Sequence, residues 1–182
     1  DDHEKLLAIA QTLHASGNLR GVLTHAGESY TATNRKALVA AAENERASAV
    51  RAAEILRHAG HGCPVVSIGS TPTALFAENY DGITEVRAGV FAFFDLVQAG
   101  LGVCSPQDIA VSVLATVIGH QREKGWTIID AGWAALSSDR GTESQSVDQG
   151  YGLVCDLEGN IMHGLFVANA NQEHGIIARR AG

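Results

Sequence analysis

Residues 65–73 read VVSIGSTPT, a β-branched apolar run that ends in a loop of small hydrogen-bonding residues. The run predicts a buried strand, and Gly69, Ser70 and Thr71 follow it directly. Such a loop can hold a phosphate group, because Gly lets the main chain come close while N–H and hydroxyl groups donate hydrogen bonds. Pro72 suits the first turn of a short helix. A capped helix start without a ligand fits the same residues, and the stretch alone leaves both interpretations open.

The segments on either side of this stretch alternate between helix and strand. Apolar residues recur at helical spacing in 4–16, and LRGVL at 19–23 is typical of a short buried strand. The segment at 33–59, rich in Ala, Glu and Arg, predicts a longer helix. TEVRAGVFAFF at 84–94 is predicted to be another strand. This alternation favours parallel strands joined by right-handed helical crossovers.

The pattern changes after residue 95. β-branched runs divided by Gly, Asn and Asp are typical of antiparallel strands, and they include LVQAGLGVC at 96–104 and DIAVSVLATVIGH at 108–120. CDLEGNIMHGL at 155–165 predicts a β-hairpin. The sequence therefore predicts an α/β fold followed by a β-rich domain, with the boundary after residue 98.

Composition and charge exclude several classes of protein. The chain has 182 residues, a net charge of −7 and 13 scattered Lys and Arg, so neither nucleic acid nor an anionic membrane is an expected partner. Cys63, Cys104 and Cys155 lack the CxxC spacing of a zinc site and do not form an even disulfide set. No apolar run is long enough to span a bilayer. We expect a protein of a reducing, cytoplasmic compartment that acts on a small molecule.

Two further segments carry side chains suited to chemistry. THAGESY at 24–30 follows a predicted strand, and loops in this position often carry the catalytic groups of α/β proteins, although a lone His and Tyr in a loop, such as His25 and Tyr30, are more often structural. Arg87 lies on a predicted strand close to Glu85. A charged group there needs a partner, which is either Glu85 or a ligand anion or ring nitrogen.

Histidines occur in two other places that could be functional. HAGHGC at 58–63 has the residue types of a metal site, but it joins a helix end to a strand on the side away from the predicted ligand face, so no metal is expected there. Glu173 and His174 follow an apolar run. They could be a general base with its orienting partner, or a turn with two solvated polar side chains.

Taken in chain order, six segments resemble the D-threonine aldolase and D-serine dehydratase-like family over nearly the whole chain. These segments are THAGESY, SIGSTPT, TEVRAGVFAFFD, DIAVSVLATVIG, IDAGWAALSSDRG and ANQEHG. Members of the family are pyridoxal 5'-phosphate (PLP) enzymes of the alanine racemase fold type. The resemblance implies that residues 1–98 are the C-terminal portion of a PLP-binding (β/α)8-type barrel. Residues 99–182 would be a truncated D-serine dehydratase-like, β-rich domain.

The resemblance also implies roles for individual residues. Those expected to bind the cofactor are Tyr30, Gly69, Ser70, Thr71, Arg87 and Gly89. By analogy with the wider racemase fold, Arg87 would face the pyridine nitrogen, and the backbone near Gly89 would face the phosphate. His25 is a candidate for proton transfer, and Glu173 and His174 would support a metal region. Phe91 stands where many relatives have Tyr, so no hydroxyl role is assigned there.

Two catalytic parts of the family are expected outside this chain. The Schiff-base lysine would precede it, because none of Lys5, Lys36 and Lys124 falls in a corresponding motif. The ligands of a divalent metal, zinc or manganese, are a His followed two residues later by Cys or Asp, and they are expected beyond residue 182. The 182 residues alone are therefore expected to be catalytically inactive.

The intact protein is expected to be a PLP- and metal-dependent lyase that acts on small D-3-hydroxy amino acids and forms a homodimer. Its reaction would be dehydration, as for D-serine, or retro-aldol cleavage, as for D-threonine. The alternatives are an amino-acid racemase of the same fold type and a non-catalytic module that binds PLP.

Overall fold

A computed structural model describes residues 2–180 and divides the chain into two compact units. The first comprises residues 1–92 and 101–103, and the second comprises residues 93–100 and 104–182. Because the two units interleave between residues 93 and 103, the contacts define no single boundary. The domain boundary after residue 98 therefore stays a prediction.

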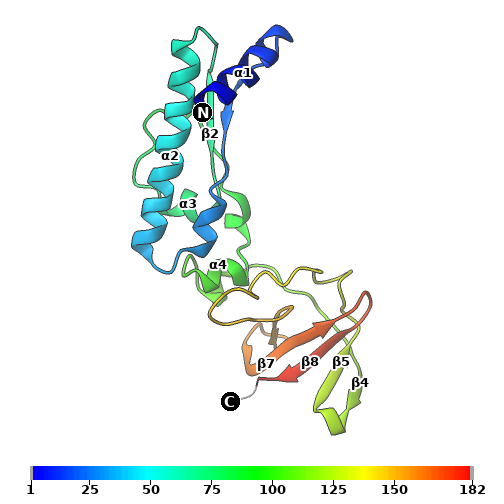
Figure 1. Cartoon of the computed structure of the whole chain (residues 1–182). Coiled ribbons are helices and arrows are strands. Elements are labelled where there is room, and N and C mark those ends of the chain that lie inside the picture. Colours follow the sequence, from blue (N-terminus) through cyan, green and yellow to red (C-terminus); the bar gives the residue numbers. More distant parts are fainter. Residues whose placement is uncertain (1, 181–182) are drawn as a thin grey trace. The chain divides into compact units, whose positions relative to one another are not determined.

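The first unit is a three-stranded parallel sheet with helices (Figure 1). Its elements are α1 (Asp2–Ala15), β1 (Gly21–Leu23), the 3-10 helix η1 (Gly27–Thr31), α2 (Arg35–His58), β2 (Val65–Ile68), α3 (Thr71–Phe76), β3 (Glu85–Val86) and the 3-10 helix η2 (Gly89–Ala92). The strand order is β1-β2-β3, with Val22 opposite Val66 and Ile68 opposite Val86. The prediction of parallel strands with helical crossovers is confirmed.

Helix α2 covers one face of this sheet and lies along β1 and β2 (Figure 1). Ala53 and Leu56 of the helix pack with Val66 and Ile68 of β2 in the core of the unit. Each large apolar side chain buried in this way contributes about 1.5–3 kcal/mol. Since neighbouring residues of a strand alternate between faces, Ser67 lies on the face away from α2. In a closed barrel that face is the interior.

The strand predicted at 84–94 is mostly wrong. Only Glu85 and Val86 pair with β2, and residues 89–92 form η2 instead. The physical reason is Gly89, whose φ of +69° turns the chain out of the extended conformation. Phe91 and Phe93, which the pattern counted as strand residues, are exposed.

The second unit contains a five-stranded antiparallel sheet of order β4-β5-β8-β7-β6 (Figure 1). The elements of this unit are α4 (Leu96–Gly100), η3 (Pro106–Asp108), β4 (Val117–Gln121), η4 (Arg122–Lys124), β5 (Trp126–Ile129), β6 (Leu153–Cys155), β7 (Ile161–Ala170) and β8 (Gly175–Arg179). The predicted hairpin at 155–165 is confirmed, with Cys155 opposite Ile161. Ile129, Ala131 and Val167 form the buried centre of the sheet.

Two predicted strands of this unit are wrong in part or in full. Residues 96–100 form α4, because Asp95 Oδ1 accepts a hydrogen bond of 2.8 Å from the N–H of Gln98 and so caps a helix. In the segment 108–120, strand structure begins only at Val117. The α/β class with a β-rich second part is confirmed. Within residues 2–180, no helix has the length and apolar character needed to cross a membrane.

Candidate functional site

The predicted cofactor residues lie on three loops at one edge of the parallel sheet. The loop after β1 carries His25 and Tyr30, the loop after β2 begins at Gly69, and β3 leads into Arg87 and Gly89. Because β1, β2 and β3 are parallel neighbours, their carboxyl ends lie at the same edge, which is where (β/α) barrels place their active sites. The structure thus brings together residues far apart in the chain: Arg87 Nη2 donates to the carbonyl of Thr24, which lies 63 positions earlier.

The loop after β2 is held by a capping box at the start of α3. Ser70 Oγ accepts from the N–H of Thr73 at 3.4 Å, and the N–H of Ser70 donates to Thr73 Oγ1 at 3.2 Å. Ser29 Oγ lies 3.2 Å from Ser70 Oγ. Only 2 % of Ser70 is exposed, so its hydroxyl group is committed to the protein. The helix start predicted from Pro72 is confirmed.

The hydroxyl group of Thr71 is also used internally. It donates to the carbonyl of Ala88 at 2.8 Å and accepts from the N–H of Val90 at 2.8 Å, which joins the loop after β2 to the loop after β3. The donors left for a ligand are main-chain groups. Within residues 2–180, the N–H groups of Thr71 and Gly89 have no hydrogen-bond partner.

This donor set fits a phosphate group. Thr71 is 1 % exposed, and a buried N–H group without a partner is rare because it costs free energy comparable to a lost hydrogen bond. Gly89 lies beside Thr71, since a Cβ at Gly89 would be 2.6 Å from Thr71 Oγ1. Two neighbouring N–H groups of this kind can donate to the oxygens of one anion.

His25 is bound to the same loop. Its Nδ1 lies 3.0 Å from the carbonyl oxygen of Gly69, and the centroids of the His25 and Tyr30 rings are 6.0 Å apart. A carbonyl oxygen can only accept, so this bond requires the hydrogen on Nδ1. In the neutral ring, Nε2 is then free to accept a proton.

The guanidinium group of Arg87 is linked to Glu85 through the hydroxyl group of Ser67. Nη1 donates to Ser67 Oγ at 2.6 Å and Nη2 donates to the carbonyl of Thr24, while the Ser67 hydroxyl donates to Glu85 Oε1. Ser67 therefore lies between the two charged groups. The guanidinium group is held at the carboxyl ends of the strands, on the face away from α2.

Sequence reasoning missed the acid that supports this loop. Glu45 of α2 is 3 % exposed; Oε1 accepts from the N–H of Gly69 at 2.9 Å, and Oε2 accepts from Thr73 Oγ1 at 2.6 Å. A signal was present, because Glu45 falls on the buried stripe of the helix. That stripe consists of Leu38, Ala42, Glu45, Ala49, Ala53 and Leu56.

In the second unit, Glu173 and His174 lie in the turn between β7 and β8. Asn171 Oδ1 accepts from the N–H groups of Glu173 at 3.2 Å and His174 at 2.8 Å, and both side chains are exposed. Gln172 Nε2 donates to Glu173 Oε1 at 3.1 Å. The polar turn is the interpretation that these contacts favour.

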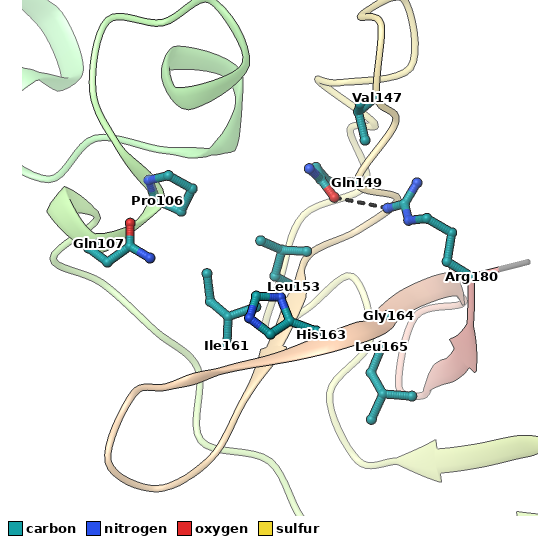
Figure 2. Close-up of a pocket in the computed structure, with 10 residues that line it drawn as sticks. All are labelled: Pro106, Gln107, Val147, Gln149, Leu153, Ile161, His163, Gly164, Leu165 and Arg180. Carbon is teal, nitrogen blue, oxygen red and sulfur yellow. Dashed lines mark hydrogen bonds between the residues drawn. The ribbon is translucent and has the colours of Figure 1, made fainter. Parts of the chain in front are cut away.

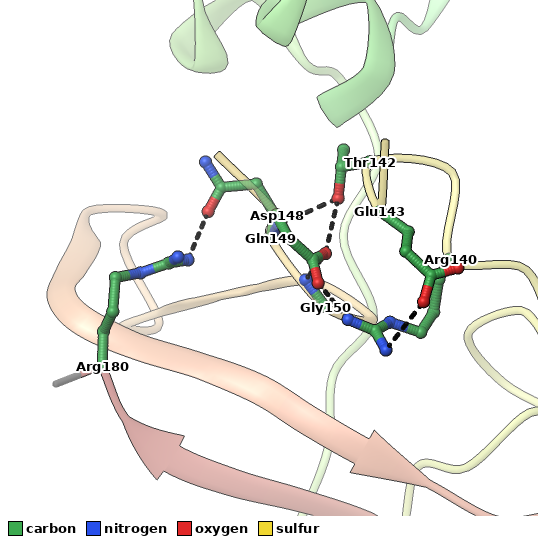
Figure 3. A network of polar contacts seen from close by, with 7 residues as sticks. All are labelled: Arg140, Thr142, Glu143, Asp148, Gln149, Gly150 and Arg180. Carbon is green, nitrogen blue, oxygen red and sulfur yellow. Dashed lines mark hydrogen bonds and ion pairs between the residues drawn. The ribbon is translucent and has the colours of Figure 1, made fainter. Parts of the chain in front are cut away.

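A polar network shapes the long loop before β6 (Figure 3). Asp148 accepts from the N–H of Gly150 at 2.8 Å, from Thr142 Oγ1 at 3.2 Å and from Arg140. The Gly150 N–H group, followed by Thr142 and Arg140, lowers the pKa of Asp148 against the opposing effect of burial. The carboxylate therefore stays ionised and organises the loop.

A cavity of about 340 Å³ opens beside this network (Figure 2). Leu153, Ile161 and Leu165 supply apolar walls, and the lining also includes Arg180 and Gln149, where Arg180 Nη2 donates to Gln149 Oε1 at 2.9 Å. None of the residues predicted from sequence lines this cavity.

For metals, the part of the chain from residue 2 to residue 180 holds no group of three His, Cys, Asp or Glu side chains that could bind an ion. In the 58–63 segment, His58 Nδ1 bonds to the carbonyl of Glu54 at 2.7 Å, and Arg57 donates to the carbonyl of Cys63. The metal ligands predicted beyond residue 182 lie outside the described residues.

A parallel strand-and-helix unit followed by a β-rich unit is the architecture of PLP-dependent enzymes of the alanine racemase type. The chain belongs to the alanine racemase N-terminal domain family: the model "Alanine racemase, N-terminal domain" matches residues 1–97, and "Putative serine dehydratase domain" matches residues 110–182.

Characterised relatives agree with this assignment. The D-threo-3-hydroxyaspartate dehydratase of Delftia sp. strain HT23 is 62 % identical over 183 residues, which is 100 % of this chain and 48 % of the relative. Its solved structure matches with a TM-score of 0.91 over 98 % of this chain and 48 % of its own. The D-serine dehydratase of Dictyostelium discoideum is 37 % identical over 67 % of this chain and 32 % of its own.

A solved alanine racemase-like protein from Idiomarina loihiensis is 48 % identical, with a TM-score of 0.87 over 96 % of this chain and 46 % of its own. One structure of the Delftia dehydratase is a cysteine variant in a metal-free form. The chain spans about half the length of the Delftia relative.

Proposed function

We propose that the full-length protein is a PLP-dependent dehydratase of D-3-hydroxy amino acids, and that the first unit of this chain binds the phosphate end of the cofactor. The observation that carries the proposal is the pair of unpartnered N–H groups at Thr71 and Gly89, one of them buried, at the carboxyl ends of parallel strands. The names of the relatives, which are dehydratases of D-hydroxy amino acids, support the reaction.

Each residue of the site has a role in this proposal. The N–H groups of Thr71 and Gly89 donate to the phosphate, and the phenol of Tyr30 lies beside His25 to contact the cofactor. Arg87, fixed by Ser67, directs its positive charge toward the ring nitrogen. PLP, when bound, stabilises negative charge at the α-carbon of an amino acid. The protein residues hold the cofactor in one orientation.

His25 is the proton-transfer group of this chain. Its Nδ1–H donates to the carbonyl of Gly69, which leaves Nε2 to accept and return a proton close to the bound cofactor. A divalent metal would assist departure of the substrate hydroxyl as a Lewis acid, and the metal-free form of the Delftia relative supports its use. The Schiff-base lysine and the metal ligands belong, in this proposal, to other parts of a full-length homodimer.

The test is to identify the products formed by the full-length protein from D-serine, D-threo-3-hydroxyaspartate and D-threonine. A dehydratase releases ammonia and a keto acid in equal amounts. Repeating the assay with added chelator tests whether the reaction requires a metal. Glycine and an aldehyde from D-threonine would indicate retro-aldol cleavage instead. Loss of optical purity without a keto acid would indicate a racemase, and PLP binding without turnover would indicate a binding module.

A further inference from the structure

Glu45 is a buried acid with no assigned role. It lies in the middle of the apolar stripe of α2, between Ala42 and Ala49, and only 3 % of it is exposed. Its hydrogen bonds in the described residues are to two neutral donors, the N–H of Gly69 and the hydroxyl of Thr73.

Helix packing alone does not account for an acid at this position. Transfer of a carboxyl group out of water is costly, and apolar residues of similar volume usually pack at least as well. Both oxygens of Glu45 instead contact the loop that begins at Gly69. Glu45 therefore supports the loop through hydrogen bonds and does not serve as a packing residue of the core.

The contacts of Glu45 fix the orientation of one peptide group and the loop after it. The N–H of Gly69 donates to Glu45 Oε1 at 2.9 Å, while the carbonyl of the same residue faces His25 Nδ1 at 3.0 Å. Through Oε2, Glu45 holds Thr73 Oγ1, which in turn accepts from the N–H of Ser70. Gly69, which precedes the Ser70–Thr71 peptide, and Thr73, which follows it, are thus both hydrogen-bonded to the carboxyl group of Glu45.

We infer that Glu45 is a positioning residue of the cofactor site, which holds the loop so that the N–H of Thr71 remains directed to the phosphate. The inference rests on the proposed function. Glu45 acts through the loop and does not itself contact the cofactor. Because this loop holds the phosphate in the proposed site, loss of Glu45 should weaken binding of the phosphate group more than binding of the ring.

The experiment compares PLP with pyridoxal, which has the same ring and aldehyde but no phosphate. Dissociation constants of both compounds are measured by titrating the cofactor-free full-length protein and its Glu45→Ala and Glu45→Gln variants. Glu45→Ala should weaken PLP binding by about tenfold or more and change pyridoxal binding less than about twofold. Glu45→Gln should weaken PLP less, because its amide oxygen still accepts one hydrogen bond.

Two further variants complete the design. Glu43→Gln is the matched control, because Glu43 lies on the same helix but is exposed and paired with Arg46, and it should leave both constants unchanged. Thr73→Val removes the hydroxyl between Glu45 and Ser70, so it should also weaken PLP selectively. It provides the answer if Glu45→Ala does not fold.

Equal weakening of PLP and pyridoxal in the Glu45 and Thr73 variants would overturn the inference, because it would indicate a general structural role. Unchanged PLP affinity in these variants would overturn it as well. A wild-type protein that binds neither compound would refute the proposed function itself, so the two failures are distinguishable.

Discussion

Replacement of Gly69 by Ala is the most informative single substitution in the first unit. Gly69 has a φ of +145°, and a Cβ built there would lie 2.1 Å from the carbonyl oxygen of Arg87 and 2.7 Å from its nitrogen. These are backbone atoms at the end of β3, so they cannot move aside as the tip of a side chain can. To admit the methyl group, the ends of β2 and β3 must separate.

The cost follows from two contributions. Holding Ala in a backbone conformation that L-residues rarely adopt costs about 1–3 kcal/mol. Separation of the strands also breaks the 2.8 Å hydrogen bond from the N–H of Arg87 to the carbonyl of Ile68, which costs about another 1–3 kcal/mol. A total near 4 kcal/mol is large against the 5–15 kcal/mol by which proteins are usually stable.

The assay is denaturant unfolding of the full-length protein, together with PLP titration. Gly69→Ala should lower the unfolding midpoint strongly and weaken PLP binding. Gly62→Ala is the control, since nothing lies within 4 Å of a Cβ at Gly62 and its φ is not in the left-handed region; it should change stability by less than about 0.5 kcal/mol. If the free energy of unfolding of the Gly69→Ala variant lay within about 0.5 kcal/mol of the wild-type value, the close approach of β2 and β3 would be refuted.

Three other substitutions give separate tests. His25→Gln can still donate to the carbonyl of Gly69 but cannot accept a proton, so it should keep PLP affinity while kcat falls by about 10²–10⁴; an unchanged kcat would exclude His25 as the proton-transfer group. Asp148→Asn should destabilise the second unit by about 1 kcal/mol at pH 7. Folding lowers the pKa of the Asp148 carboxyl group, so its stabilising effect is complete above the unfolded pKa of about 3.9 and is lost as pH falls through the lower folded pKa. The unfolding midpoints of the wild type and the Asp148→Asn variant should therefore converge in acid. A difference between them that does not change with pH would contradict this. Asp95→Ala should cost about 1 kcal/mol in chemical denaturation through loss of the α4 cap, and no change would show that the cap is dispensable.

Helical periodicity and β-branched runs were sufficient to predict α1, β1, α2 and β2 of the first unit. The segment at 33–59 and the run at 65–68 gave α2 and β2 within two residues, because the core between them dictates both patterns. The prediction of a strand over 84–94 failed because Gly89 turns the chain out of the extended conformation. The apolar side chains beyond Gly89 continue the sequence pattern without being buried.

The strand pattern was sufficient to place the candidate residues at the carboxyl ends of neighbouring strands, but it did not predict their contacts. Residues 69–71 were predicted to offer both main-chain N–H groups and hydroxyl groups to a phosphate, but the hydroxyl groups of Ser70 and Thr71 hold the loop itself. Glu45 was missed because an acid on a helix is usually solvated, and its burial depends on a loop 24 residues further along the chain. Tertiary contacts of this kind are absent from local sequence patterns.

The most direct test of the account is a crystal structure of the full-length protein with PLP bound. The account predicts phosphate oxygens within hydrogen-bond distance, about 2.7–3.2 Å, of the main-chain nitrogens of Thr71 and Gly89. A phosphate bound elsewhere, with both N–H groups bonded to other protein atoms, would contradict it.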